Sequence, residues 1–320
     1  MKKDMQLDNP RMRAPTVSEL PKPPLGKTGW PWTFDGLTTE SNYSSSYECP
    51  RITLVTPSYN QSDFIEKTIR SVLLQGYPNL EYFLMDGNSS DSSCAVIRMY
   101  EKWITAWVSE SDRGQSHAIN KGLAKATGRV LSWLNSDDLL MPGALSLVGQ
   151  LAEKYPGAAA WVGRCHRVDP NGWLLTTAVP RGLVRNKLAD WGHRGWFYQP
   201  SCFFSATGWQ EAGPLDESLH FAMDVDLWLR LARVGEFVST RHVLSAAVIH
   251  PLAKSQSQRP SMFEEIHLIQ RRHGYEGIAD SRIANESRGG TLKERISRAV
   301  RVRFSRLLNF AKQRKRIFEP

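Results

Sequence analysis

The chain has 320 residues and a formal net charge of +9, and 41% of its residues are hydrophobic. This length fits one large or two small domains with a sizeable core. No stretch approaches the roughly 20 uninterrupted apolar residues of a membrane-spanning helix, and no apolar segment follows Lys2 and Lys3 as it would in a signal peptide. The cysteines form no Cys-x-x-Cys pair, which indicates buried thiols in a reducing compartment.

The positive charge is concentrated at the C-terminal end. Residues 288–320 hold 11 Lys or Arg and two acids, so the remainder of the chain is neutral overall. We therefore expect no nucleic-acid partner. From Thr291 onward, apolar residues recur every three or four positions among basic ones, as in an amphipathic helix that binds an anionic membrane surface. We expect residues 276–320 to form a basic helical tail of this kind; a solvated helix, or one packed on the domain, is the alternative.

The N-terminal 50 residues are rich in proline and serine and lack helical or strand periodicity. This composition predicts a flexible, largely irregular leader. Gly26-Lys27-Thr28 resembles the end of a phosphate-binding loop, but the glycine required five positions earlier is Pro21, so the motif is rejected. Trp30 and Trp32 are unusual in such a segment, and we expect them to pack on the surface of the folded domain.

The folded region is predicted to begin at Arg51 with four strand–turn–helix units. Apolar runs at 52–55, 80–85, 104–108 and 130–134 are typical of buried strands, and polar turn residues follow each. Such repetition predicts a Rossmann-like, mostly parallel central sheet flanked by helices, with the turns gathered at the edge where α/β proteins bind ligands. Asp63, with Glu66 three residues later, is predicted to cap the first helix. No Gly-x-Gly-x-x-Gly follows any strand, which disfavours a dinucleotide-binding dehydrogenase.

The fourth strand runs directly into Asp137 and Asp138. Adjacent carboxylates repel each other unless a cation or hydrogen-bond donors lie between them. An isolated pair of this kind is more often a helix-capping turn than a binding site. The role of the Asp pair therefore has to be inferred from the other motifs of the chain.

The second half of the chain carries further strands and an aromatic cluster. A strand is predicted over 158–168, followed by a hairpin turn at 169–172 and a second strand. Trp191, Trp196, Phe197 and Tyr198 cluster next; they serve either a sugar-binding surface or the core. Asp224 precedes an amphipathic helix that ends at Gly235, and His250 follows an apolar strand over 243–249.

Several of these segments, in this order, resemble family 2 glycosyltransferases with the GT-A fold, over roughly residues 50–255. The segments are Thr56-Pro57-Ser58-Tyr59-Asn60, Asp86-Gly87-Asn88-Ser89-Ser90-Asp91, Asp112-Arg113-Gly114-Gln115-Ser116 followed by Asn135-Ser136-Asp137-Asp138, and Asp224-Val225-Asp226-Leu227-Trp228-Leu229-Arg230. The resemblance implies an inverting enzyme that moves a sugar from a nucleotide-diphosphate donor, with a UDP-sugar favoured, to an acceptor hydroxyl. A glycan or lipid-linked glycan of bacterial surface polysaccharide synthesis is the implied acceptor.

The resemblance also implies roles for individual residues. Those implied to hold the donor are Thr56, Pro57, Ser58, Tyr59, Asn60, Asp86, Arg113, Lys121 and Asp137. Among them, Asp86 would accept a hydrogen bond from the base and Asp137 would contact the ribose. Asp138 would bind Mg²⁺ or Mn²⁺, which prefer hard oxygen ligands. His250 is the second metal candidate, with a purely structural role as the alternative.

Asp224 is implied to be the general base that takes the proton of the acceptor hydroxyl. The chain departs from the family pattern at two positions. Asn135 stands where many relatives have Asp, and a neutral amide is a poor metal ligand. Met223 stands where relatives usually have Glu, which leaves the base itself in place. Asp226 lies two residues further along the helix, and we expect it to be structural.

We therefore expect a GT-A domain over residues 51–275, with a nucleotide-binding half at 51–140 and an acceptor half at 141–255. The expected location is the cytoplasm, at the inner face of the plasma membrane. Two alternatives stay open. A sugar-nucleotide nucleotidyltransferase would carry a Gly-rich basic loop after the first strand, where this chain has Thr56–Asn60. A non-catalytic, membrane-associated glycan-binding protein would keep the aromatic cluster and need no metal.

Overall fold

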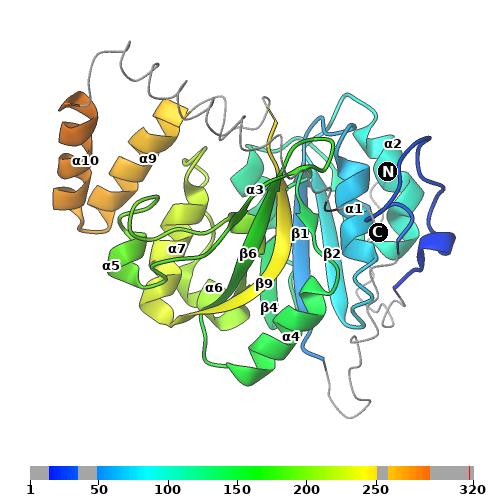
Figure 1. The fold of residues 1–320 in the computed structure, drawn as a ribbon, viewed down its shortest axis with the longest axis horizontal. Helices are drawn as coiled ribbons and strands as arrows, with labels where there is room; N and C mark the ends of the chain where they lie inside the picture. Colours follow the sequence, from blue (N-terminus) through cyan, green and yellow to red (C-terminus); the bar gives the residue numbers. More distant parts are fainter. Residues whose placement is uncertain (1–13, 35–48, 251–258, 289–316, 318–320) are drawn as a thin grey trace.

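The computed structural model describes residues 14–34, 49–250, 259–288 and 317 (Figure 1). Within them, one nine-stranded sheet has the order β3-β2-β1-β4-β8-β6-β9-β5, and β7 pairs with β6. The predicted α/β fold is confirmed, and its first half is the predicted set of parallel strands. The elements of this half are β1 (Ile52–Ser58), α1 (Ile65–Leu73), β2 (Leu80–Asp86), α2 (Ser93–Tyr100), β3 (Ala106–Ser109), α3 (Gln115–Leu123) and β4 (Val130–Trp133).

The second half adds antiparallel pairs to this sheet. Strand β8 pairs antiparallel with β4 and β6, while β9 runs parallel to β6 and antiparallel to the short β5. The predicted hairpin at 169–172 is confirmed, since β7 pairs with β6 and Gly172 N–H donates to the Asp169 carbonyl at 2.9 Å. The elements of this half are β5 (Leu139–Leu140), α4 (Ala144–Lys154), β6 (Ala160–Val168), β7 (Leu174–Ala178), α5 (Arg185–Leu188), β8 (Cys202–Ser205), α6 (Ala206–Ala212), α7 (Met223–Val234), β9 (Phe237–Val248), α9 (Arg259–Arg272) and α10 (Glu276–Arg288). Single turns of 3-10 helix lie at Val17–Glu19, Glu101–Trp103 and Gln199–Ser201.

Helices cover both faces of the sheet because alternate strand residues point to opposite sides. On β1, Leu54 belongs to the hydrophobic cluster shared with α1, α2 and α4, whereas Val55 belongs to the cluster shared with α3 and α7. Leu84 and Met85 of β2 divide in the same way. The parallel strands are therefore buried on both sides, which is why each is a continuous apolar run in the sequence.

A stacked tryptophan pair joins α7 to the middle of the sheet. The rings of Trp133, on β4, and Trp228, on α7, lie 5.6 Å apart with an interplanar angle of 7°. Both side chains are fully buried, and Phe197 and Phe204 pack against the Trp228 ring. This pair determines where the start of α7 lies relative to the end of β4.

The predicted cap of α1 is wrong. The N-cap residue is Phe64, which makes no side-chain cap, and Asp63 lies exposed just outside the helix. The reason is a preceding turn: the Gln61 carbonyl accepts the N–H groups of both Phe64 and Ile65 at 2.9 Å. The helix therefore starts one residue later than the Asp63–Glu66 spacing indicates.

Residues 14–34, which we call the N-terminal strap, pack against α1 and α2. Arg70 of α1 is completely buried, and its guanidinium donates to the carbonyls of Pro21, Pro31 and Trp32 at 2.9–3.1 Å and to the Tyr100 hydroxyl at 3.1 Å. The strap is irregular apart from Val17–Glu19, as its composition predicts, but it is a packed part of the domain.

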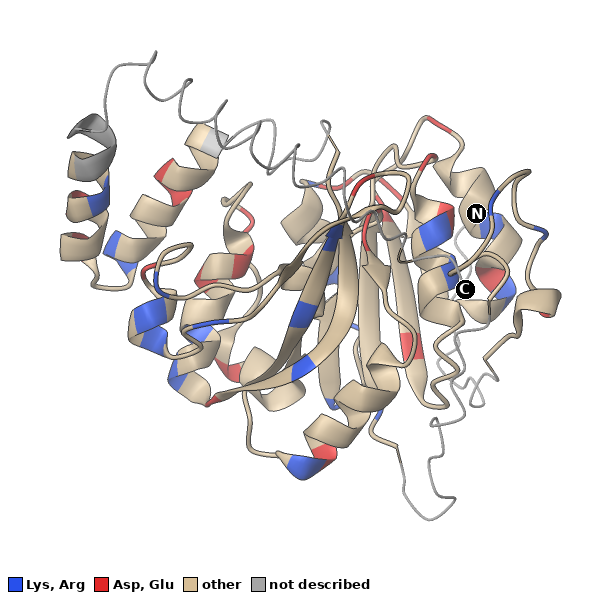
Figure 2. Cartoon of the chain, viewed as in Figure 1, with Lys and Arg blue, Asp and Glu red and all other residues tan. Residues whose placement is uncertain are grey.

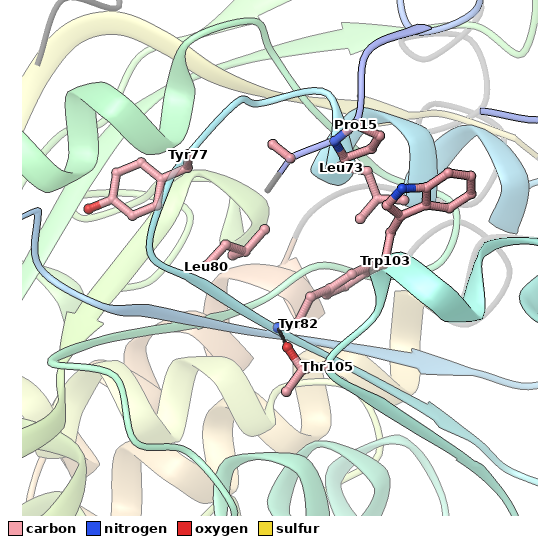
Figure 3. Close-up of a pocket in the computed structure, with 8 residues that line it drawn as sticks. Pro15, Leu73, Tyr77, Leu80, Tyr82, Trp103 and Thr105 are labelled. Atoms are coloured by element: carbon pink, nitrogen blue, oxygen red, sulfur yellow. Dashed lines mark hydrogen bonds between the residues drawn. The ribbon is translucent and has the colours of Figure 1, made fainter. Parts of the chain in front are cut away.

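The expectation that the strap tryptophans pack on the domain is confirmed. Trp30 and Trp32 are 3% and 7% exposed. The Trp30 indole N–H donates to the Leu140 carbonyl at 2.9 Å, two residues after the Asp pair. At its other end the strap closes a small pocket over the sheet edge (Figure 3), lined by Ala14, Pro15, Leu73, Tyr77, Leu80, Tyr82, Trp103 and Thr105.

The C-terminal tail lies almost wholly outside the described residues. Helix α10 ends at Arg288, and beyond it only Ile317 is described, where it packs against the core. The predicted amphipathic helix after Thr291 and its binding to anionic membranes therefore stay predictions. Among the described helices, none is both long and apolar enough to span a membrane.

Deleting the N-terminal strap should destabilise the domain strongly. A variant lacking residues 1–34 removes three carbonyl acceptors of the Arg70 guanidinium together with the buried Trp30 and Trp32 side chains. Fully burying one large apolar side chain contributes roughly 1.5–3 kcal/mol. Urea unfolding followed by circular dichroism measures this loss. The matched control lacks only residues 1–13, before the first Arg70 acceptor, and should unfold at the full-length midpoint. Equal midpoints for both deletions would contradict the role assigned to the strap.

Candidate active site

The carboxyl ends of three parallel strands meet in register at one edge of the sheet. Ser58 pairs with Asp86, and Asp86 pairs with Ser109, so the last residues of β1, β2 and β3 lie side by side. Figure 2 shows acidic segments gathered at this edge, above the strands. The chain therefore brings the predicted donor-binding motifs together where open α/β sheets bind ligands.

Asp86 is 1% exposed, and protein donors surround its carboxylate. Its Oδ2 accepts Ser89 N–H at 2.9 Å, the Ser109 hydroxyl at 2.7 Å and the Cys94 thiol at 3.3 Å. Among the described residues, Oδ1 accepts only the Ser89 hydroxyl, at 2.5 Å. Burial alone raises the pKa of Asp86, but the hydrogen bonds from Ser89 and Ser109 outweigh it and hold the pKa below its ordinary value. Because a carboxylate oxygen has two lone pairs, Oδ1 retains one acceptor position.

The loop after β1 is tied to the loop after β2. Asn60 N–H donates to the Ser89 hydroxyl at 2.8 Å, and the Asn60 side-chain oxygen accepts Ser90 N–H at 2.9 Å. Asn60 itself adopts a left-handed backbone with φ of 51°, which asparagine tolerates better than most residues. The two segments thus form one rigid cradle, which we call the β1–β2 cradle (residues 56–62 and 86–93).

Residues of the Thr56–Asn60 segment differ in which of their groups are accessible to a ligand in the cradle. Tyr59 is 63% exposed and offers an open ring face. Thr56 is buried, and its hydroxyl accepts the Tyr82 hydroxyl at 3.1 Å, so only its backbone faces the site. The Ser58 hydroxyl is buried and has no hydrogen-bond partner among the described residues. An orphaned hydroxyl of this kind at a sheet edge suits a ligand contact.

Asp137 and His250 are brought together from segments more than 100 residues apart. His250 Nε2 lies 3.0 Å from Asp137 Oδ2, and the imidazole stacks on the Phe64 ring with centroids 4.6 Å apart. His250 is 6% exposed, whereas the Asp137 side chain is 23% exposed. Together they present one oxygen and one nitrogen ligand at the end of β4.

Asp138 points the other way, into the protein. It is 6% exposed, its Oδ2 accepts the Asn135 amide at 3.3 Å, and the Val248 backbone N–H also donates to its carboxyl. Burial, followed by the charge of Asp137, raises the pKa of Asp138 well above its ordinary value. Of the two, Asp137 is the more exposed and lies beside His250, while Asp138 as the metal ligand stays a prediction.

Asn135 has a structural reason to be an amide. Its oxygen accepts the Gln115 side-chain N–H at 2.7 Å while its own N–H donates to Asp138. An aspartate here could not donate and would repel the neighbouring carboxyl. Gln115, which lies in the predicted motif but received no role, is thereby connected to the Asp pair.

The two predicted basic ligands of the donor form ion pairs with protein carboxylates. Arg113 Nη2 lies 2.6 Å from Glu217 Oε2, with the Arg113 side chain 69% exposed. Lys121 Nζ lies 2.9 Å from Glu110 Oε1. Arg113 lies just before α3, and Lys121 lies in the last turn of α3 with its ammonium beside Glu110, just after β3. Each would have to exchange its carboxylate for a donor phosphate.

Asp224 lies in the first turn of α7, one helical turn before Trp228. Residues four apart on a helix share a face, so the Trp133–Trp228 stack holds Asp224 near the end of β4. Burial raises the pKa of Asp224 to about 6, opposed by hydrogen bonding from Val225 N–H and reinforced by the charge of Glu265. A carboxyl with this pKa is charged near neutral pH and still basic enough to take a proton.

Asp226 is structural, as expected. Its Oδ2 accepts Arg230 Nε at 2.8 Å, and its Oδ1 lies 2.8 Å from His273 Nε2, with only 10% of the side chain exposed. It therefore ties α7 to the end of α9 and points away from the acceptor side.

The aromatic cluster divides between the core and the surface of the acceptor half. Phe197 is 2% exposed and packs on Trp228, so it belongs to the core. Trp196 and Tyr198 are only half-buried, with ring centroids 5.1 Å apart. Gln199 was assigned no role from the sequence, yet its amide donates to the Trp133 carbonyl at 2.8 Å and its buried oxygen has no partner among the described residues.

Comparison with known proteins agrees with this architecture. The sequence model of the glycosyl transferase family 2 matches residues 53–204. An uncharacterized glycosyltransferase of Mycobacterium tuberculosis is 30% identical over 201 residues, which cover 61% of this chain and 74% of that protein. The chain belongs to glycosyl transferase family 2.

Other curated relatives are longer or match over a shorter stretch. The putative teichuronic acid biosynthesis glycosyltransferase TuaG of Bacillus subtilis is 39% identical over 92 residues, which cover 28% of this chain and 36% of TuaG. The chain likewise spans 30% of the length of an uncharacterized glycosyltransferase of Rickettsia bellii, with 26% identity.

Solved structures share the fold at low sequence identity. S. aureus TarS 1-349 in complex with UDP-GlcNAc aligns with a TM-score of 0.59 and 14% identity, covering 77% of each chain. The mannosyltransferase PcManGT from Pyrobaculum calidifontis, in complex with GDP-Man and Mn²⁺, aligns with a TM-score of 0.52 and 19% identity, covering 90% of this chain and 86% of that one. The expected GT-A fold is confirmed.

Asp86→Asn should loosen the β1–β2 cradle. An amide nitrogen in place of one carboxylate oxygen cannot accept the donors there, and leaving them unsatisfied costs roughly 1–3 kcal/mol. Chemical denaturation measures the loss. The matched control is Asp63→Asn, an exposed aspartate just before α1, which should unfold like the unmodified protein. If the two variants are equally stable, the hydrogen bonds of Asp86 do not hold the cradle.

Proposed function

We propose that the protein is an inverting glycosyltransferase that moves a sugar from a nucleotide-diphosphate donor to an acceptor hydroxyl. The observation that carries the proposal is the Trp133–Trp228 stack, which holds the Asp224 carboxyl, with a pKa of about 6, beside the strand that leads to Asp137 and His250. A general base and a diphosphate site on one sheet edge are what this transfer needs.

The β1–β2 cradle is the proposed site of the nucleobase and ribose. The exposed Tyr59 ring would stack on the base, and the free lone pair of Asp86 Oδ1 would accept a ring N–H. The unpartnered Ser58 hydroxyl would form a further contact. A UDP-sugar is the favoured donor, a choice supported by the likeness to TarS with its bound UDP-GlcNAc.

Arg113 and Lys121 would meet the diphosphate after leaving their carboxylate partners. Exposed ion pairs such as Arg113–Glu217 contribute roughly 1 kcal/mol or less, so a doubly charged phosphate group competes readily for the guanidinium. Bidentate pairing with phosphate oxygens is the geometry to which a guanidinium is suited. The Lys121–Glu110 pair would open in the same way. After Arg113 leaves, Glu217 would keep the hydrogen bond that its Oε1 already accepts from the Asn120 amide at 3.2 Å.

Asp137 and His250 would hold a divalent cation, Mg²⁺ or Mn²⁺. Within the described residues no group of three acidic, His or Cys side chains converges to hold a metal. One carboxylate and one imidazole still fit, because Mg²⁺ in nucleotide sites is commonly bound by one or two protein ligands together with phosphates and water. When bound, the cation would supply positive charge to the departing diphosphate. The likeness to PcManGT with its Mn²⁺ supports this choice.

Asp224 would act as the general base of the transfer. It accepts the proton of the acceptor hydroxyl as that oxygen forms a bond to C1 of the sugar and the bond from C1 to the diphosphate oxygen breaks. Attack from the face opposite the diphosphate inverts the configuration at C1. A glycan or lipid-linked glycan of bacterial surface polysaccharide synthesis is the proposed acceptor, a choice supported by the likeness to the putative teichuronic acid biosynthesis glycosyltransferase TuaG.

Release of nucleotide diphosphate from a panel of UDP- and GDP-sugars, with and without Mn²⁺, tests the proposed function directly. A product whose anomeric configuration is opposite to that of the donor sugar would support inversion. No turnover of any donor with a panel of glycan acceptors, together with no binding of nucleotide diphosphates, would overturn the proposal.

Asp224→Asn should reduce transfer by on the order of 10² to 10⁴-fold, which is the usual scale for losing a general base. Donor affinity and the unfolding midpoint should stay unchanged, because burial already disfavours the charged form. In the unmodified enzyme, kcat/KM should rise with pH through about 6 and then level off, since the base acts only when deprotonated. Full activity of the variant would assign the base elsewhere.

A pair of neighbouring substitutions distinguishes the two candidate metal ligands. Asp137→Asn should abolish the Mn²⁺ dependence of UDP binding, because it removes the carboxylate that faces His250. Asp138→Asn makes the same isosteric replacement at a carboxyl that points inward, and should retain the dependence. Calorimetric titration of UDP with and without Mn²⁺ provides the readout. The reverse pattern would restore Asp138 as the ligand.

A further inference from the structure

A carboxylate from α9 caps the start of α7. Glu265 Oε1 accepts the backbone N–H of His220 at 2.8 Å, and its Oε2 accepts those of Phe221 and Ala222 at 2.8 and 2.9 Å. Three consecutive backbone donors, immediately before the first residue of α7, thus converge on one side chain more than 40 residues later in the chain.

Glu265 supplies an acceptor to the N-cap residue and to the two residues before it, while Val225 N–H in the first turn already donates to Asp224 Oδ1 at 2.8 Å. The first N–H groups of a helix lack partners within the helix, and a carboxylate there is favoured by both hydrogen bonding and the helix dipole. The N-cap residue of α7 is Ala222, which has no side-chain acceptor. Asp224 lies two residues further on, so the segment that Glu265 holds is the one that carries the proposed base.

Helix α9 is held by contacts with the rest of the domain, so it can act as a fixed support. Ile266 and Ile269 are buried in the hydrophobic cluster that includes α7. Arg272 pairs with Asp216 at 2.8 Å, and the buried Gln270 amide donates to the Ala189 carbonyl at 2.8 Å. These contacts, made by the part of α9 that follows Glu265, hold the helix against the domain and so place Glu265 against the 220–222 segment.

We propose that Glu265 is a positioning residue for the transfer: by clamping the N–H groups of residues 220–222 it holds Asp224 in place at the acceptor. It follows that α9, which lies beyond the residues 53–204 matched by the family model, is part of the catalytic unit. This inference rests on the proposed role of Asp224 as the base.

The electrostatics around Asp224 support the proposal. The titratable groups that affect it from neighbouring elements are Glu265 on α9 and the buried Cys202 thiol on β8. After burial, the Glu265 charge is the remaining factor that raises the pKa of Asp224. Removing that charge should therefore lower the pKa of the base and shift the acidic limb of kcat/KM to lower pH.

Two substitutions at Glu265 and one beside it form the test. Glu265→Ala removes the clamp and should lower kcat by on the order of 10 to 100-fold, the scale of a small misplacement of a catalytic group, with the affinity for nucleotide diphosphate unchanged. Glu265→Gln keeps one acceptor oxygen, should recover part of kcat, and should shift the acidic limb to lower pH. Glu264→Gln removes the same charge at the adjacent exposed position and should leave both unchanged.

Hydrogen exchange of the backbone amides provides a readout that does not depend on turnover. Peptides covering residues 218–226 should exchange faster in Glu265→Ala than in the unmodified protein, while peptides from the β1–β2 cradle should not change. Should Glu265→Ala fail to fold, the kcat and pH profile of Glu265→Gln provide the same test. An unaltered kcat and an unaltered pH profile in the folded Glu265 variants would overturn the proposal.

The Asp224→Asn variant distinguishes a failure of the Glu265 positioning role from a failure of Asp224 as the base. If that variant loses transfer while Glu265→Ala retains full kcat, Asp224 keeps its role and only the positioning role of Glu265 is overturned. If Asp224→Asn remains fully active, the assignment of the base fails, and the positioning role fails with it.

Discussion

The stack of Trp133 on Trp228 is the contact on which the arrangement of the site depends. It joins β4 to α7 with ring centroids 5.6 Å apart, and both indoles are completely buried. Asp137 lies four residues after Trp133, and Asp224 lies four residues before Trp228. The proposed metal ligand and the proposed base are therefore both tied to one apolar contact, and a pair of large buried aromatic rings of this kind is costly to displace.

The carboxyl groups at this edge differ because their surroundings differ. Asp86 is buried among hydroxyl, thiol and backbone donors, which lower its pKa despite the burial. Asp138 and Asp224 are buried with fewer donors, and their pKa values are raised. Asp137 is partly exposed beside His250. Their different surroundings thus suit the aspartates to different proposed roles: nucleoside binding, structural support of the Asp pair, proton transfer and cation binding.

Two segments outside the residues matched by the family model stabilise what lies inside them. The N-terminal strap satisfies the buried Arg70 and reaches Leu140, just after the Asp pair. Helix α9 reaches the start of α7 through Glu265. In each case the support comes from a distant part of the chain because local residues cannot provide it. The buried Arg70 guanidinium of α1 needs acceptors from outside its helix, and the N-cap residue of α7 is an alanine. The proposed active site is therefore a property of the larger fold.

The sequence by itself determined the parallel half of the sheet, the edge where the site lies and the motifs that meet there. Buried strands have continuous apolar runs, and the polar turns after them are local signals. Only the tertiary structure decided which aspartate faces His250, because both lie in the loop between β4 and β5 and His250 comes from a segment more than 100 residues away. It alone revealed the Glu265 clamp and the contacts of the strap with Arg70, since side chains distant in sequence carry no local mark of their partners. The Asp63 cap was predicted wrongly because a turn closed by the Gln61 carbonyl outweighed a capping pattern.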